Sequence, residues 1–128
     1  MSNYKCCVLV TNASGDYSHT ENEAESSGTG SHAGGFSLAT GTLAFSQGDH
    51  CVADGKTSTS FGSNTYSQNN SEFALGRSNH SHTGETLAEQ TLFSVGCGDF
   101  EEIDMSKRIE QQLPLPTTED GTNALEIM

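Results

Sequence analysis

Two histidines are the residues of this chain best placed, by type and spacing, to do chemistry. In His80-Ser81-His82 they lie two positions apart, so on a β-strand both imidazoles face the same side. Three copies of such a strand around an axis would offer six ring nitrogens, a ligand set suited to iron or zinc. The surrounding pattern places this strand on a polar outer face, so we predict surface histidines and no bound metal or cofactor.

The four cysteines give a weaker chemical signal. Cys6, Cys7, Cys51 and Cys97 lack the paired Cys-x-x-Cys spacing of zinc and redox motifs. Cys51 falls where the repeat described below requires a small inward residue, and we interpret it as a compact apolar filler.

Patterns typical of enzymes are missing from the sequence. No Gly-x-Ser-x-Gly elbow joins a strand to a helix. Carboxylates that cleave glycosidic bonds lie roughly 5 to 10 Å apart, whereas the candidate acids are scattered along the chain: Asp49, Asp54, Glu72 and Glu85. Such acids would have to pair across an interface between chains. We therefore predict a non-enzymatic protein, with a glycan-processing enzyme as the alternative.

Composition restricts both the fold and the partners. Only 32% of the 128 residues are hydrophobic, there is no Trp, and the formal net charge is −12. A chain so acidic repels nucleic acid and anionic membranes, and we exclude both as partners. The low apolar fraction also meets a crude criterion for disorder, but the regular repeat argues against it.

The feature that organises the chain is a seven-residue repeat of the form small-x-Ala/Ser-x-Gly. Its last position is occupied in turn by Gly35, Gly41, Gly48, Gly55, Gly62, Asn69, Gly76 and Thr83. Two positions earlier stand Ala33, Ala39, Ser46, Ala53, Ser60, Ser67, Ala74 and Ser81. Period-two spacing of small residues predicts short strands with one nearly flat face, and Gly predicts a permissive corner after each strand.

Two such units predict one flattened coil of about 14 residues. We therefore expect an all-β fold, a parallel β-roll in which coils stack and only small residues fit inside. A lead-in with a strand at 4–10 occupies 1–13, the roll spans 14–98, and a C-terminal arm spans 99–128. Within these we expect a solvated bulge at 21–25, a closing strand at 92–96, a helix or irregular arm at 100–113, a turn at 120–121 and a last strand at 124–127.

The residues between the small ones alternate from unit to unit. One outward set is apolar and repeats every fourteen residues, and we predict it to be an oligomer interface: Phe45, Phe61, Phe73, Leu75 and Phe93. Burying the first three of these Phe side chains together with Leu75 would contribute about 6 to 12 kcal/mol before association costs. The other set, with Leu38, Val52, Tyr66 and His80, is expected to be the polar outside. Its candidate ligand contacts are Tyr66, Gln68, Asn69 and Asn70.

The repeat resembles the head repeats of trimeric autotransporter adhesins and the related repeats of phage and prophage tail fibres. Ser31-His32-Ala33-Gly34-Gly35 is similar to the Ser-His-Ala-x-Gly unit of the fibres, and Leu92 to Gly98 and Asn123 to Met128 resemble the segments that follow their rolls. The resemblance covers about 14–98 and the last six residues. Residues 99–122 depart from it as an insertion, and the family's membrane anchor and self-cleaving chaperone domain have no counterpart.

This resemblance implies a left-handed, trimeric roll that serves as an attachment or spacer module. The implied location is a virion tail fibre or a bacterial cell surface, and the sequence has neither a signal peptide nor a transmembrane segment. The implied partners are two further copies of the chain and a cell-surface glycan or protein receptor. A purely structural fibre segment is a further alternative.

Overall fold

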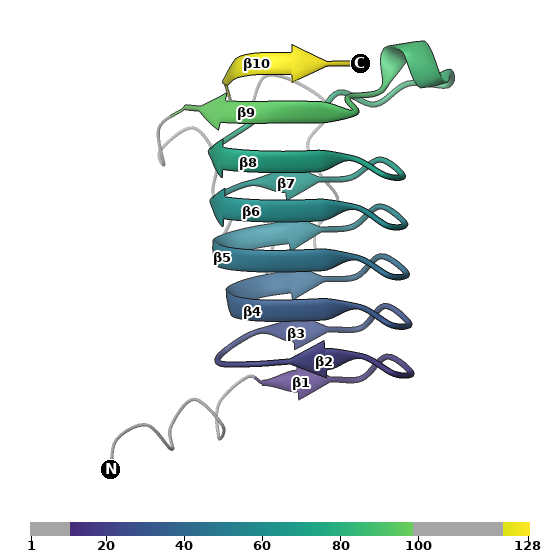
Figure 1. Ribbon diagram of the computed structural model, residues 1–128, viewed down its shortest axis with the longest axis vertical. Coiled ribbons are helices and arrows are strands. Elements are labelled where there is room, and N and C mark those ends of the chain that lie inside the picture. Colours follow the sequence, from purple (N-terminus) through teal and green to yellow (C-terminus); the bar gives the residue numbers. More distant parts are fainter. Residues whose placement is uncertain (1–10, 99–121) are drawn as a thin grey trace.

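The computed structural model describes residues 11–98 and 122–128. In this part the chain forms a β-solenoid of about five stacked coils (Figure 1). The strands are β1 (Asn12–Ala13), β2 (His19–Thr20), β3 (Glu25–Ser26), β4 (His32–Ala39), β5 (Phe45–Ala53), β6 (Thr59–Ser63), β7 (Tyr66–Ser67), β8 (Phe73–Arg77), β9 (Phe93–Cys97) and β10 (Asn123–Ile127). A short 3-10 helix, η2 (Leu87–Glu89), lies between β8 and β9.

Parallel pairing joins each coil to the next at a regular step. Ala33 pairs with Ser46 at a step of 13 residues, and Ser46 with Ser60 and Ser60 with Ala74 at steps of 14. The next step, from Ala74 to Ser94, is 20 residues because a short insertion loops out of the last coil. The predicted coil of about 14 residues and the all-β roll are confirmed.

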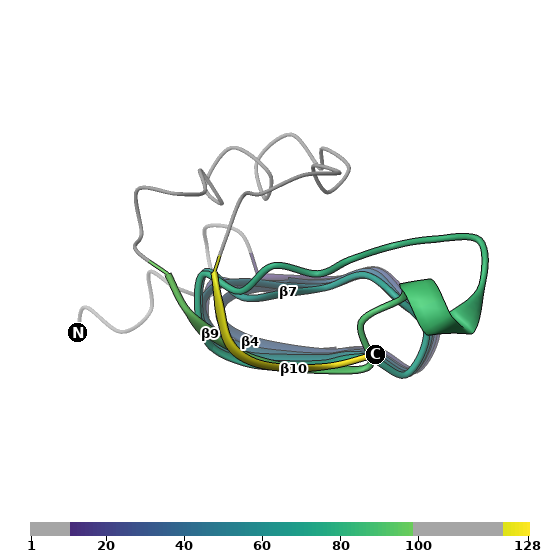
Figure 2. The ribbon, with the colours of Figure 1, turned by 90° about the horizontal axis from the view of Figure 1, so that it is seen from above.

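Viewed down the stack, the roll consists of two facing walls (Figure 2). β7 lies in one wall, and β9 and β10 lie in the other. The predicted inward positions are buried, which confirms that only small side chains fit between the walls: Ala33, Ala39, Ser46, Cys51, Ala53, Ser60, Ser67 and Ala74. Burial raises the pKa of the Cys51 thiol, which keeps it protonated and consistent with a filler.

Two ladders of glycine run along the corners of the roll, for two different reasons. At one corner Gly48 and Gly62 adopt positive φ angles of 135° and 131°, as the sequence predicts. At the other corner the need is for space. A Cβ on Gly41 would lie 2.1 Å from the carbonyl oxygen of Gly55, and one on Gly55 would lie 2.0 Å from that of Asn69. Gly41 and Gly55 therefore allow close stacking of backbones, and the turn is made by neighbours such as Thr57, whose φ is 57°.

The ends of the roll correct one expectation and confirm two. The solvated bulge at 21–25 is wrong, since Ala24 is buried and β3 pairs with both β1 and β4. The predicted closing strand is β9, and the predicted last strand is β10, which pairs with β9 antiparallel. The expected strand at 4–10, the helix or arm at 100–113 and the turn at 120–121 lie outside the described residues. Over the described residues no helix has the length and hydrophobicity needed to cross a membrane.

Candidate functional site

The apolar set predicted from the sequence forms two columns on the outer face of one wall. Pairing aligns β5, β6, β8 and β9, so each outward residue stacks on its counterpart in the next coil. We call this surface the apolar wall. Its members are Phe45, Thr59, Phe73 and Phe93 in one column and Gln47, Phe61, Leu75 and Val95 in the other.

The apolar wall is open to solvent and carries no ionisable side chain. Phe61 is 49% exposed and Phe73 is 40% exposed. The Phe45 and Phe61 rings stack at a centroid distance of 6.3 Å, and Phe73 and Phe93 stack at 5.9 Å. On a chain with a net charge of −12, an uncharged aromatic surface of this kind is a candidate contact site.

Towards the N-terminus the same column becomes polar. His19, His32 and Phe45 form a continuous ring stack, with centroid distances of 4.9 and 4.8 Å. The Nε2 atom of His32 lies 3.7 Å from a carboxylate oxygen of Glu21. The apolar character of the wall is therefore confined to β5 and the strands that follow it.

The second wall differs from its prediction. Its outward column of Leu38, Val52 and Tyr66 is buried, each side chain being 3% exposed. The interpretation of this set as a polar, solvent-facing outside is wrong for these three residues. Their burial makes them part of the structural core of this chain.

Of the four predicted ligand contacts, some are buried and others are accessible. Tyr66 is buried, and Asn69, at 7% exposure, points its amide into the roll. Both are corrected from ligand contacts to structural residues, because a receptor cannot reach them. Gln68 is half-buried and donates to the Ser81 carbonyl over 2.7 Å. Asn70 is exposed, and it alone of the four fully keeps the surface position predicted for it.

Asn69 is part of a buried polar cluster that the repeat pattern did not reveal. Glu72 stands where other coils have a small residue, and it is fully buried. One of its carboxylate oxygens, Oε2, accepts four hydrogen bonds: from the Gln68 and Asn69 amides (3.0 Å each), from Asn69 Nδ2 (2.9 Å) and from Ser81 Oγ (2.7 Å). The other oxygen, Oε1, has no donor among the described residues. Burial outweighs these bonds and raises the pKa of Glu72 to about 7.

The cluster lies at the base of the insertion in the last coil. Asn69 Nδ2 also donates to the carbonyls of His82 (2.8 Å) and Thr91 (3.2 Å), which are the two ends of the inserted segment. Within the insertion, Thr86 N donates to Glu89 Oε2 over 3.0 Å, which lowers the pKa of Glu89. The inserted segment is therefore held by hydrogen bonds at its base and within its turn.

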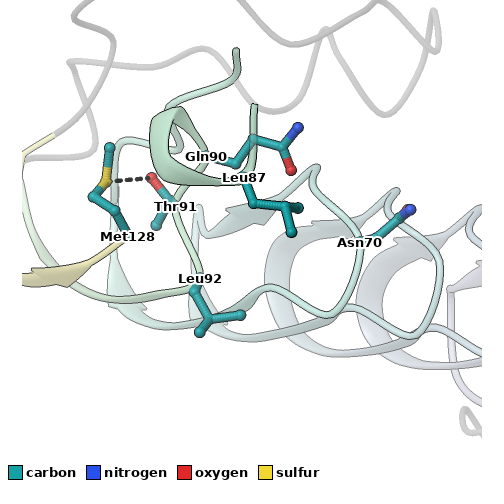
Figure 3. Close-up of a pocket in the computed structure, with 6 residues that line it drawn as sticks. All are labelled: Asn70, Leu87, Gln90, Thr91, Leu92 and Met128. Carbon is teal, nitrogen blue, oxygen red and sulfur yellow. Dashed lines mark hydrogen bonds between the residues drawn. The ribbon is translucent and has the colours of Figure 1, made fainter. Parts of the chain in front are cut away.

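A small pocket opens between this insertion, the corner of the coil below and the end of β10 (Figure 3). Its volume is about 170 Å³. Leucine and methionine side chains supply its apolar lining, with carboxamides beside them: Asn70, Leu87, Gln90, Thr91, Leu92 and Met128. The sequence signal for this site was the loss of the seven-residue period after residue 83, which marks a segment that the roll does not need.

The two histidines considered for metal binding form a close pair in one chain. The His80 and His82 rings are 4.2 Å apart, and His82 Nδ1 lies 2.7 Å from Glu126 Oε2. Over residues 11–98 and 122–128, no three His, Cys, Asp or Glu side chains gather in a metal-binding cluster. Of the four candidate acids, Glu72 is inside the roll, while Asp49 lies 2.7 Å from His50. Neither arrangement pairs two carboxylates for glycoside hydrolysis.

The fold defines the chain as a β-solenoid repeat protein. No family model matches it, and neither a curated protein nor a solved structure is detectably similar. The surfaces of the roll are therefore the evidence for what the protein does.

Proposed function

We propose that this chain is a non-enzymatic attachment or structural module that works as a homotrimer, as in a phage-like tail fibre or a bacterial surface adhesin. The observation that carries the proposal is the apolar wall. Phe61 and Phe73 leave about half of their surface in water, on a rigid and uncharged face. Association of copies through this face would remove that surface from water and leave the acidic residues outside.

The proposed mechanism is geometric. A stiff roll that assembles in three copies presents three identical sets of weak contacts, and multivalency strengthens their combined binding to a repetitive surface. The proposed contact points are Asn70 and the adjacent pocket at Leu87 and Gln90, because a receptor can reach them. A cell-surface glycan or protein is the proposed receptor.

The mass in solution tests the assembly. We expect light scattering after size exclusion to give about three times 13.5 kDa, with a strand-rich circular dichroism spectrum on the same peak. Changing Phe61 and Phe73 together to Glu should place like charges in the contact and give a monomer. An assembly whose mass is unchanged by this double substitution would contradict the proposal.

Receptor binding is tested separately. We expect binding on a glycan array or to host envelope protein, weakened by Asn70→Ala combined with Leu87→Ala but retained in Thr42→Ala, an exposed change at the equivalent corner of an earlier coil. A trimer that binds none of these targets would instead be a purely structural fibre segment.

A further inference from the structure

The C-terminal strand adds one more strand to the apolar wall. In β10, Leu125 pairs with Val95 and Ile127 pairs with Phe93. Directly opposed residues on neighbouring strands point to the same face, so both side chains lie on the outer face of the wall. Leu125 is 51% exposed and Ile127 is 50% exposed.

The residue between them turns to the other face and anchors the strand. Glu126 pairs with the buried Ser94, and its Oε2 accepts hydrogen bonds from Thr91 Oγ1 and from His82 Nδ1, the latter at 2.7 Å. Partial burial alone would raise the pKa of Glu126, but these hydrogen bonds bring it below its ordinary value. The carboxylate is therefore ionised at neutral pH and holds β10 against the last coil.

A second anchor reaches the opposite wall. Asn123 Oδ1 accepts from the amide of His80, and Asn123 Nδ2 donates to the carbonyl of the same residue, each over 2.8 Å. Backbone bonds from Leu92 N to Ile127 O (2.7 Å) and from Cys97 N to Thr122 O (2.8 Å) complete the attachment. Because β10 is already fixed in the single chain, little ordering cost remains when its outer side chains meet a partner.

We propose that β10 is part of the self-association surface, and that Leu125 and Ile127 bind the apolar wall of a second copy of this chain. The inference rests on the proposed function and extends its interface beyond the repeat. With β10 the uncharged surface runs without interruption over five strands, about 19 Å at the usual strand spacing. A partner for this face must offer an apolar and uncharged surface of its own, and the same wall of another copy is such a surface.

The test compares matched pairs of substitutions in the full chain. Leu125→Ser with Ile127→Ser should raise the concentration at which the assembly dissociates at least tenfold, measured by light scattering over a dilution series. The control changes two exposed apolar residues outside the wall and the pocket, Tyr17→Ser with Leu43→Ser, and should leave that concentration unchanged. Amide hydrogen exchange at Leu92 and Cys97 reports whether β10 is still seated in the variant.

A second measurement needs no substitution. Hydroxyl-radical labelling of the unaltered protein should fall at Leu125 and Ile127 as its concentration rises through assembly, while labelling of Tyr17 and Leu43 stays constant. If Phe61→Glu with Phe73→Glu dissociates the assembly but labelling at β10 does not change, the inference is wrong and the proposed function stands. If the unaltered protein is a monomer at every concentration, both are wrong.

Discussion

The regular coils and the last coil of this roll solve the same packing problem in opposite ways. In the regular coils the backbone of each corner lies against the next, and Gly41 and Gly55 leave no room for a Cβ. At the last coil the chain departs into an insertion, and the side chains of Asn69 and Glu72 fill the corner instead. Asn69 and Glu72 together fill the space under the insertion, and we call these two side chains the polar plug. The comparison shows that a departure from the repeat can mark a change in the segment that stacks on the next coil.

The largest expected effect is the loss of the close approach at a regular corner. In Gly55→Ala the new Cβ would lie 2.0 Å from a backbone oxygen of the next coil, so two coils must separate. We expect a loss of more than about 4 kcal/mol of stability, the range reserved for severe core disruption. Thermal unfolding followed by circular dichroism measures it. Lys56→Ala, an exposed change at the same corner, is the control, and equal melting temperatures for the two variants would contradict the stacking argument.

The second prediction concerns Glu72 of the polar plug and the pH dependence of stability that it causes. The pKa of Glu72 is raised from 4.5 to about 7 in the folded chain, so folding is favoured by the protonated form. The stability that protonation supplies is complete below pH 4.5 and is lost as pH rises through 7, a change of about 3 kcal/mol. Glu72→Gln keeps the shape without the charge, and its Oε1 can accept the same four hydrogen bonds.

We therefore expect Glu72→Gln to match the unaltered protein near pH 4 and to exceed it by about 3 kcal/mol at pH 8. Chemical unfolding at fixed protein concentration across this range measures the difference. Glu85→Gln, an exposed carboxylate in the inserted segment, serves as the control and should follow the unaltered protein. If the free energy of unfolding of Glu72→Gln and of the unaltered protein changed with pH in the same way, Glu72 would not have the raised pKa.

The contrast between coils also explains which features the sequence could predict. Small residues at every second position and glycine at most corners indicate a narrow interior, so the coil length and most of the core could be predicted from the pattern. The sequence predicts Asn69 to be a corner residue and a ligand contact, because an Asn in a Gly position looks the same whether its side chain points out or in. The structure distinguishes the two cases, because the pairing of Ala74 with Ser94 shows that an insertion lies above Asn69.

The apolar wall was predictable for the same reason, and its last strand was not. Phe45 and Phe73 lie two coil lengths apart, and Phe61 and Leu75 lie one coil length apart, so the alignment within each column needs no further information. Leu125 and Ile127 join them through antiparallel pairing with a register shift between Asn123 and Leu125, which no repeat specifies.

The smallest expected effect concerns a corner residue that has a positive φ but is not glycine. Thr57 has a φ of 57°, a conformation that is costly for a β-branched side chain and well tolerated by Asn. Thr57→Asn should therefore stabilise the roll by about 0.5 to 1 kcal/mol, even though it removes the 3.0 Å contact between Thr57 Oγ1 and Ser71 Oγ. Thr42→Asn, at a neighbouring exposed threonine without a positive φ, should change stability by less. A loss of stability in Thr57→Asn, measured by chemical unfolding, would mean that the hydroxyl ladder along this corner outweighs the backbone strain.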